Sequence, residues 1–165
     1  MTHDADYFIR HLAMEEHVEG GYCKEIYQNS RTLNQAGGDS PKKRCLSSTI
    51  YYLLKSGQVS KFHRLQSDEI WFFHTGSPLL VHMIDSQGDL TTARLGLDVS
   101  SGELPQVLVP AGTMFGAEVT VDDSFTLVSC MVSPGFDYDD FQLYTYGELL
   151  ALYPRHTALI SRFYR

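Results

Sequence analysis

The chain has 165 residues, of which 43% are hydrophobic and 20% are charged, and its formal charge at pH 7 is −7. This length and composition predict one globular domain over residues 1–165. The acidic balance argues against nucleic acid as the main partner, because phosphate binding depends on concentrated Lys and Arg. No apolar run approaches the ~20 residues that a membrane-spanning helix requires, so we expect no membrane partner.

The N-terminal sequence and the cysteines indicate a reducing compartment. The first residues, MTHDADYFIRHLAMEEH, place acids where a signal peptide has a basic region followed by an apolar stretch, so we expect a cytoplasmic protein. Cys23, Cys45 and Cys130 are odd in number and form no CxxC pair. They predict reduced thiols, with neither a disulfide framework nor a cysteine zinc site.

The order of apolar and turn-forming residues predicts an all-β protein with a short helix at each end. Apolar residues at helical spacing predict a helix over residues 4–12, with Asp4 as its cap. The polar segment 29–44 has no hydrophobic period and is interpreted as a long loop. Short β-rich runs separated by turn residues follow, namely LSSTIYYLL, KFHRL, EIWFFH, LLVHMI, QVLVP and SFTLVSCMV. A second helix is predicted over residues 148–153, ended by Pro154.

Residues 57–76 contain one histidine and one glutamate at a characteristic spacing. Gly57 is followed after five residues by His63, then by Leu65 and Glu69, and after six further residues by Gly76. This resembles the first motif of the cupin superfamily, which reads Gly, five residues, His-x-His, three or four residues, Glu, six residues and Gly. Every spacing matches, but Leu65 stands where the second histidine belongs.

The resemblance continues beyond this motif. Pro110-Ala-Gly112-Thr-Met-Phe115 resembles the Pro-x-Gly-x-x-His core of the second cupin motif, with Phe115 at the histidine position. The chain is similar over most of its length to the functionally uncharacterised "cupin, fifth family" group of small bacterial and fungal proteins. The matching pieces are HVEGGY (17–22), STIYYLL (48–54), FHR (62–64), SDEIW (67–71), LG (95–96) and SPGF (133–136). The resemblance implies a single RmlC-like cupin jelly-roll β-barrel with short N- and C-terminal helices. It does not imply one activity, because cupin barrels serve oxygenases, isomerases, epimerases, sugar binders and storage proteins.

The two replaced histidines bear on the expected cofactor. A catalytic metal generally needs three or more protein donors. The motif positions supply only His63 and Glu69, since Leu65 and Phe115 are apolar. We therefore expect no cofactor, and any metal that did bind would use His63 and Glu69.

Strand alternation extends the expected pocket beyond these two residues. Residues two apart share a face of a strand, so Glu69, Trp71 and Phe73 form one row. With His63 and Glu69 facing inward from neighbouring strands, this row would line a common pocket. The residues expected to contact a substrate are Trp71, Phe73, Phe115, Arg64, Tyr22, Tyr52, Glu25 and Gln106.

The leading functional hypothesis is a metal-independent isomerase or epimerase acting on a sugar-like or carbonyl-bearing polar molecule. His63 would be the base and Glu69 its partner, because burial raises a carboxyl pKa and a nearby carboxylate raises that of His. The metal-free epimerases of deoxysugar nucleotides resemble this in outline and use a Tyr as acid, for which Tyr22, Tyr52 and Tyr138 are candidates.

Three alternatives stay open at the level of sequence. The pocket could bind a small molecule without catalysis, the protein could be a metal-dependent oxygenase with unrecognised donors, or His63 and Glu69 could simply hydrogen-bond each other. A homodimer is also expected, because cupin sheets leave edges that a second subunit covers, with residues 21–27 as the strand exchanged.

Overall fold

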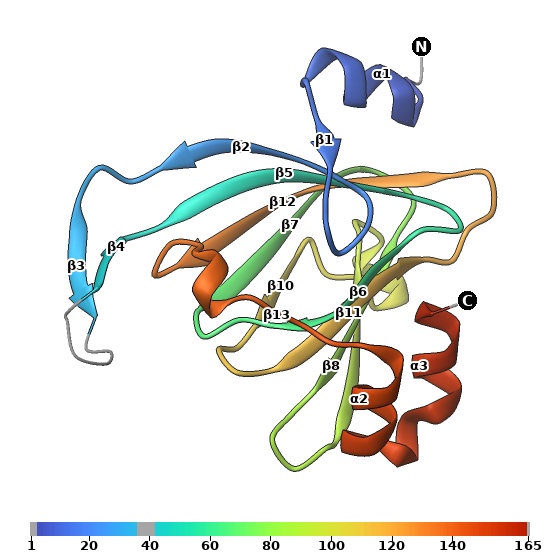
Figure 1. The fold of residues 1–165 in the computed structure, drawn as a ribbon. Coiled ribbons are helices and arrows are strands. Elements are labelled where there is room, and N and C mark those ends of the chain that lie inside the picture. Colours follow the sequence, from blue (N-terminus) through green and yellow to red (C-terminus); the bar gives the residue numbers. More distant parts are fainter. Residues whose placement is uncertain (1–2, 36–41, 165) are drawn as a thin grey trace.

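The computed structural model describes residues 3–35 and 42–164, which form two facing antiparallel sheets with helices at both ends (Figure 1). The larger sheet contains, in spatial order, β1 (Glu15–Glu16), β2 (Tyr22–Gln28), β5 (Ser48–Lys55), β12 (Phe125–Ser133), β7 (Asp68–Gly76) and β10 (Gln106–Val109). The smaller sheet contains β13 (Gln142–Leu143), β6 (Val59–Arg64), β11 (Met114–Val119), β8 (Leu79–Ile84) and β9 (Leu90–Leu95). The predicted all-β architecture with terminal helices is confirmed.

The main core lies between the inner faces of the two sheets. Tyr52 and Trp71 project from the larger sheet and Phe115 from the smaller one, and all three are almost completely buried. The Trp71 ring meets Tyr52 and Phe115 edge-on, with centroid distances of 5.6 and 6.4 Å. Such edge-to-face contacts combine large buried area with favourable quadrupole geometry. These rings fill one part of the barrel interior, and the functional cavity lies beside them.

The N-terminal helix α1 (Ala5–His11) forms where the sequence predicts it. The Asp4 side chain accepts a hydrogen bond from the Tyr7 amide, as an N-cap residue does. Ala5 and Met14 pack with Leu53 and Leu127 of the larger sheet. The helix is therefore held against the outer face of that sheet.

The C-terminal region contains more helix than the sequence predicts. Helix α2 (Tyr146–Leu152) begins earlier than expected, at a capping box formed by Thr145 and Glu148. After Pro154 a 3-10 turn η3 (Pro154–His156) leads into α3 (Thr157–Phe163), which was not predicted. Pro154 ends α2 but fits the first turn of the next helical segment. The backbone N–H groups of a first turn have no partner within the helix, so the missing N–H of proline costs no hydrogen bond there. Two further 3-10 turns are η1 (Val99–Ser101) and η2 (Tyr138–Asp140).

The predicted loop over residues 29–44 is wrong for its described parts. β3 (Thr32–Gln35) pairs antiparallel with β4 (Lys42–Cys45), while residues 36–41 lie outside the described residues. These strands form a separate two-stranded sheet. Their sequences therefore show no alternation of apolar and polar residues from which the strands could be predicted. Arg44 anchors β4, because its buried guanidinium donates from Nε to the Gly135 carbonyl at 3.2 Å and pairs with Asp140.

Among the residues that the structure describes, no helix has the length and apolarity needed to cross a membrane.

Candidate functional site

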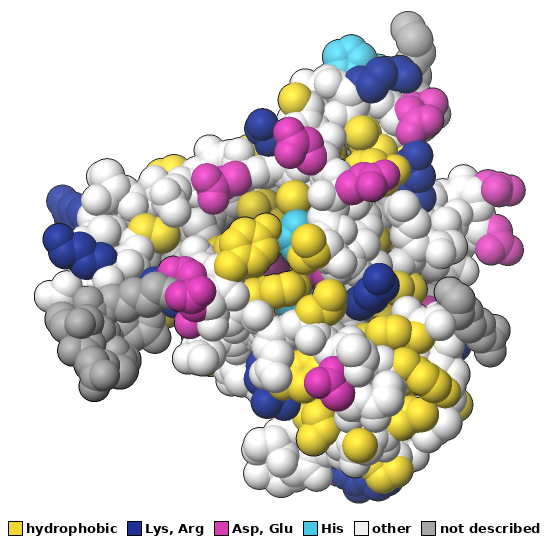
Figure 2. Space-filling view, in the orientation of Figure 1, with side chains coloured by type: hydrophobic (Ala, Val, Ile, Leu, Met, Phe, Trp, Pro, Cys, Tyr) yellow, Lys and Arg dark blue, Asp and Glu magenta, His cyan; other side chains and the backbone are white. Residues whose placement is uncertain are grey.

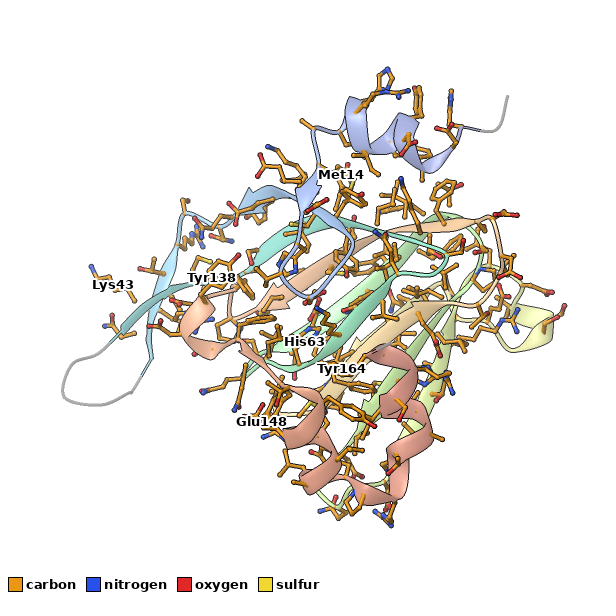
Figure 3. All side chains as sticks on the ribbon, turned by 45° about the vertical axis from the view of Figure 1, so that its right-hand side comes forward. Met14, Lys43, His63, Tyr138, Glu148 and Tyr164 are labelled. Carbon is orange, nitrogen blue, oxygen red and sulfur yellow. The ribbon has the colours of Figure 1, made fainter. Side chains whose placement is uncertain are left out.

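A cavity of about 160 Å³ lies inside the barrel, between the two sheets. Figure 2 shows a hollow in the middle of the visible face with hydrophobic side chains and a histidine at its edge. Figure 3 shows His63 in the interior of the barrel and Tyr138 near one end of it. The lining residues are His17, Glu19, Cys23, Glu25, Ser48, Ile50, Tyr52, His63, Leu65, Glu69, Cys130, Val132, Phe136, Tyr138 and Phe141.

The protonation of His63 is constrained by its two neighbours. Its Nδ1 lies 2.7 Å from the Lys61 carbonyl oxygen. A carbonyl only accepts hydrogen bonds, so Nδ1 bears the hydrogen. The other nitrogen, Nε2, lies 3.3 Å from Oε2 of Glu19. The two groups form an ion pair when the imidazole carries a second proton, and they stay in contact when that proton lies on Glu19.

Glu19 reaches His63 because the chain before β2 folds tightly against β6. Gly20 adopts a φ of +114°, and a Cβ there would lie 2.1 Å from the Val59 carbonyl oxygen, so only glycine permits this approach. The Lys61 amide donates to the Glu19 carbonyl at 2.8 Å, and the Ser60 hydroxyl donates to the Glu19 carboxylate at 2.9 Å. These contacts hold the Glu19 side chain in place with its carboxylate directed at the imidazole.

A second histidine completes this group. His17 Nδ1 lies 3.6 Å from Oε2 of Glu19, the same oxygen that faces His63. His17 Nδ1 is buried and has no hydrogen-bond partner among the described residues. The Glu19 carboxylate therefore lies between two imidazoles. The sequence analysis did not predict this role for His17 or Glu19, although both belong to the piece HVEGGY on which the resemblance rests.

Glu69 lines the cavity from the larger sheet, and its carboxyl is mostly neutral at pH 7. Burial, followed by the negative charge of Glu19, raises its pKa to about 8, against a smaller opposing effect of Cys130 and Trp71. Glu69 is only 6% exposed. At neutral pH it is therefore a carboxylic acid that can donate a proton or hydrogen bond into the cavity.

The other ionisable groups near Glu69 also stay protonated. Burial raises the pKa of the Cys23 thiol to about 11 and that of the Cys130 thiol well above its usual range. Burial likewise raises the pKa of Tyr52, whose hydroxyl donates to the Gly20 carbonyl at 2.7 Å. All three cysteines are free thiols, as expected, and neither thiol in the cavity is a thiolate nucleophile at neutral pH.

The expectation that His63 and Glu69 occupy neighbouring strands is wrong. β6 belongs to the smaller sheet and β7 to the larger one, so the motif crosses from one sheet to the other between the two residues. His63 and Glu69 nevertheless both line the cavity, from opposite sheets. Tyr52 and Glu25, two of the predicted contact residues, line it as well.

Three of the aromatic residues predicted to contact a substrate, Trp71, Phe73 and Phe115, do not line the cavity. Trp71 and Phe115 are 1% exposed and belong to the main core, against which Phe73 also packs. Trp71 and Phe73 do alternate with Glu69 as predicted, but they lie further along β7, beyond the cavity wall. Phe115 packs on the His63 ring at a centroid distance of 4.1 Å, so it supports the imidazole rather than a ligand.

The remaining predicted contact residues are also placed elsewhere. Arg64 follows His63 and so points to the opposite face of β6, where its guanidinium donates to the Tyr153 hydroxyl at 3.1 Å. Tyr22 packs with the cluster beneath α1. Gln106 is exposed at the start of the edge strand β10. These three residues therefore do not line the cavity.

The donor set does not fit a cupin metal centre. Within residues 3–35 and 42–164, no group of three or more His, Cys, Asp or Glu side chains has a geometry that could hold a metal ion. Leu65 lines the cavity and Phe115 packs on His63, so hydrocarbon occupies the two positions of the missing histidines.

Comparison with known proteins agrees with this fold. Residues 6–144 match the protein family described as "Cupin superfamily (DUF985)". A crystal structure of a Shewanella oneidensis protein is 48% identical, covers 98% of each chain and has a TM-score of 0.88. A hypothetical protein from Leishmania major is 36% identical, covers 97% of this chain and 98% of its own, and has a TM-score of 0.89. An uncharacterised Saccharomyces cerevisiae protein is 29% identical over 76% of this chain and 67% of its own length.

A more distant likeness concerns the fold alone. Oxalate decarboxylase from Bacillus subtilis, in a structure at pH 4.6, is 14% identical and has a TM-score of 0.56 over 88% of this chain and 35% of its own. The family match spans most of the chain, including both strands of the first motif and Glu19. The chain belongs to the DUF985 family of the cupin superfamily.

Proposed function

We propose that the cavity binds a small polar molecule bearing a carbonyl group and catalyses metal-independent proton transfer at the carbon beside it, as isomerases and epimerases do. The family and fold are consistent with small-molecule binding. One observation carries the catalytic part of the proposal. Two walls of the same cavity hold a proton-sharing pair, His63 and Glu19, and a neutral acid, Glu69. When one group in a site can accept a proton and another is held in its protonated form, the first suits the role of base and the second that of acid.

The base would be His63. With the shared proton on Glu19, the Nε2 lone pair can remove a proton from the substrate carbon. The electrons of the broken C–H bond then move toward the carbonyl oxygen, giving an enolate. The Lys61 carbonyl holds Nδ1–H, and Nε2 carries the proton taken from carbon, which gives an imidazolium. The Glu19 carboxyl keeps its own proton throughout, and the proton on Nε2 later returns to carbon.

The acid would be Glu69. Its neutral carboxyl can donate a hydrogen bond or a proton to the developing enolate oxygen, which lowers the energy of that charge. Return of a proton to carbon, on the same or the opposite face, regenerates the carbonyl compound as substrate, isomer or epimer. Glu69 suits this role better than the three candidate tyrosines. Tyr52 already donates to Gly20, Tyr22 lies outside the cavity, and Tyr138 lines the cavity but is 64% exposed.

The size of the cavity limits the substrate. Its volume of about 160 Å³ is below the ~300–1,000 Å³ of pockets that hold drug-sized ligands. A water molecule occupies about 30 Å³ of liquid, so the space suits a molecule of few heavy atoms. A short aldehyde, ketone or sugar fragment fits this limit, and a complete nucleotide does not.

Solvent exchange at carbon provides the test. Small aldehydes, ketones and hydroxyketones are incubated with the protein in D₂O, and loss of the α-proton is followed by ¹H NMR. We expect exchange that His63→Gln slows by about 100-fold or more, the usual contribution of a positioned base. His74→Gln is the matched control, because His74 lies outside the cavity and bonds the Ser129 hydroxyl.

Two outcomes would refute the catalytic proposal. Exchange at the same rate in the parent protein and in His63→Gln would show that His63 is not the base. Compounds that raise the melting temperature of the parent protein, but undergo no exchange, would indicate a binding protein without this chemistry.

A further inference from the structure

We propose that the molecule bound in this cavity carries a positively charged ammonium group, held between the Glu25 carboxylate and an aromatic corner formed by Phe136, Tyr138 and Phe141. The proposal rests on the proposed function, for which it names the chemical class of the ligand. All four side chains line the cavity.

The aromatic corner consists of three rings that meet at steep angles. The Phe136 and Tyr138 rings are 5.0 Å apart between centroids, at an interplanar angle of 81°. Phe141 lies 6.0 Å from Phe136 at 61° and 6.3 Å from Tyr138 at 80°. All three rings line the cavity and stand at steep angles to one another, so they border it from different directions. Aromatic faces attract cations through the ring quadrupole, and compact ammonium groups are bound in proteins in this way.

The charges of the cavity also favour a cation. Among the residues that the structure describes, neither Lys nor Arg lines it, whereas Glu19, Glu25 and Glu69 do. Glu69 is mostly neutral at pH 7, and the Glu19 carboxylate is already engaged by His63 and by the Ser60 hydroxyl. Glu25 is exposed and forms no ion pair with any described residue. It is the carboxylate that remains for a ligand.

The residues around the entrance to the cavity are also mainly acidic. A second hollow of about 410 Å³ shares His17, Cys23, Glu25 and Tyr138 with the cavity. Its other walls include Glu15 and Glu16, with Lys24 as the single basic residue among its described lining. Figure 2 shows acidic side chains on the same face as the opening. A mouth lined by carboxylates raises the local concentration of cations and repels carboxylate or phosphate ligands.

The corner is placed to orient a substrate. Phe141 lies 6.3 Å from Tyr138 and 5.3 Å from the His63 ring, measured between centroids. It therefore connects the exposed Tyr138 to the buried base. An ammonium group at the corner would leave the rest of a small molecule directed toward His63 and Glu69.

Binding of two compounds with the same shape isolates the charge. Choline and 3,3-dimethyl-1-butanol differ by a positively charged nitrogen in place of a carbon, and 3,3-dimethylbutanoate supplies a negative charge on a similar skeleton. Isothermal titration of the full chain is expected to show choline binding at least about tenfold more tightly than the neutral alcohol, which is about 1.4 kcal/mol. The butanoate should bind more weakly than both. The choline affinity should fall with salt, because the mouth is open to solvent.

Matched variants assign the binding to the named side chains. Glu25→Gln and Tyr138→Leu alter exposed positions and should fold as the parent does, so each should weaken choline without lowering the melting temperature. Asp122→Asn and Tyr27→Leu are the controls, because both residues are exposed and lie outside the cavity. Equal affinity for choline and the neutral alcohol, tighter binding of the butanoate, or no choline binding at all would each overturn the proposal. So would a loss in the two control variants equal to that in Glu25→Gln.

His63→Gln separates this proposal from the proposed function. It should keep the preference for choline and lose proton exchange. Carbonyl exchange that depends on His63, without any preference for a cation, would leave the proposed function standing and refute the ligand class. A preference for the cation without proton exchange in the parent protein would support the ligand class and refute the proposed function.

Discussion

Replacing Glu69 with Gln tests the electrostatics on which the proposed acid depends. The amide has nearly the shape of a protonated carboxyl group but cannot ionise. In the parent protein, burial and the charge of Glu19 raise the pKa of Glu69 from 4.5 to about 8. The folded protein therefore retains a proton on Glu69 over a pH range in which the unfolded chain has released it.

The sign and size of the effect follow from this difference. Between the two pKa values the folded state binds one proton more than the unfolded state, so the free energy of unfolding falls as pH rises. The slope is about 1.36 kcal/mol per pH unit, which gives roughly 4 kcal/mol between about pH 5 and pH 8. This is an upper value, because water entering the cavity would reduce the desolvation of the carboxylate. Glu69→Gln removes the dependence, so the variant should gain stability relative to the parent as pH rises.

Urea denaturation followed by the fluorescence of Trp71, the single tryptophan, measures the difference. Comparing the two proteins at each pH cancels the titration of groups that they share. Glu16→Gln is the control, because Glu16 is exposed and its variant should follow the parent at every pH. A difference between parent and Glu69→Gln that stays constant from about pH 5 to pH 8 would show that Glu69 ionises normally, and the assignment of Glu69 as a neutral acid would be refuted.

Three further predictions concern the site and the assembly. His63→Ala should keep the fold and lose proton exchange, whereas Leu65→Ala should lower the free energy of unfolding by ~2–5 kcal/mol. Thermal melts and exchange rates measured on both variants check this prediction. Gly20→Ala places a Cβ 2.1 Å from the Val59 carbonyl oxygen and should displace Glu19, so both melting temperature and exchange should fall; unchanged exchange would contradict the role of Glu19. Light scattering should give the mass of a homodimer, since edge strands of the sheets are left for pairing, and a monomer mass at every concentration would contradict it.

The sequence predicts the parts of this structure that local spacing determines. The interval between His63 and Glu69 spans the connection from one sheet to the other, and it brings both side chains to one cavity. Helix α1 follows from its N-cap Asp4 and its apolar period. Each of these features depends on residues within one short segment, which is what periodicity and capping rules describe.

Contacts between distant segments could not be predicted in the same way. Glu19 lies 44 positions before His63, and their proximity depends on the close approach of Gly20 to β6. The assignment of Trp71 to the core rather than the cavity depends on how deeply each position of β7 lies in the barrel. Alternation identifies the face of a strand but gives no depth along it.

The replaced histidines and the neutral glutamate are physically connected. Imidazoles at the two motif positions would surround the Glu69 carboxyl with polar groups, and a cation that they held would lower its pKa. Here Leu65 and Phe115 supply hydrocarbon at both positions, and the carboxyl of Glu69 is buried in the same interior. Desolvation then governs its pKa, and the carboxyl keeps its proton at neutral pH. Leucine and phenylalanine at the two histidine positions therefore also favour the neutral carboxyl that the proposed proton transfer uses.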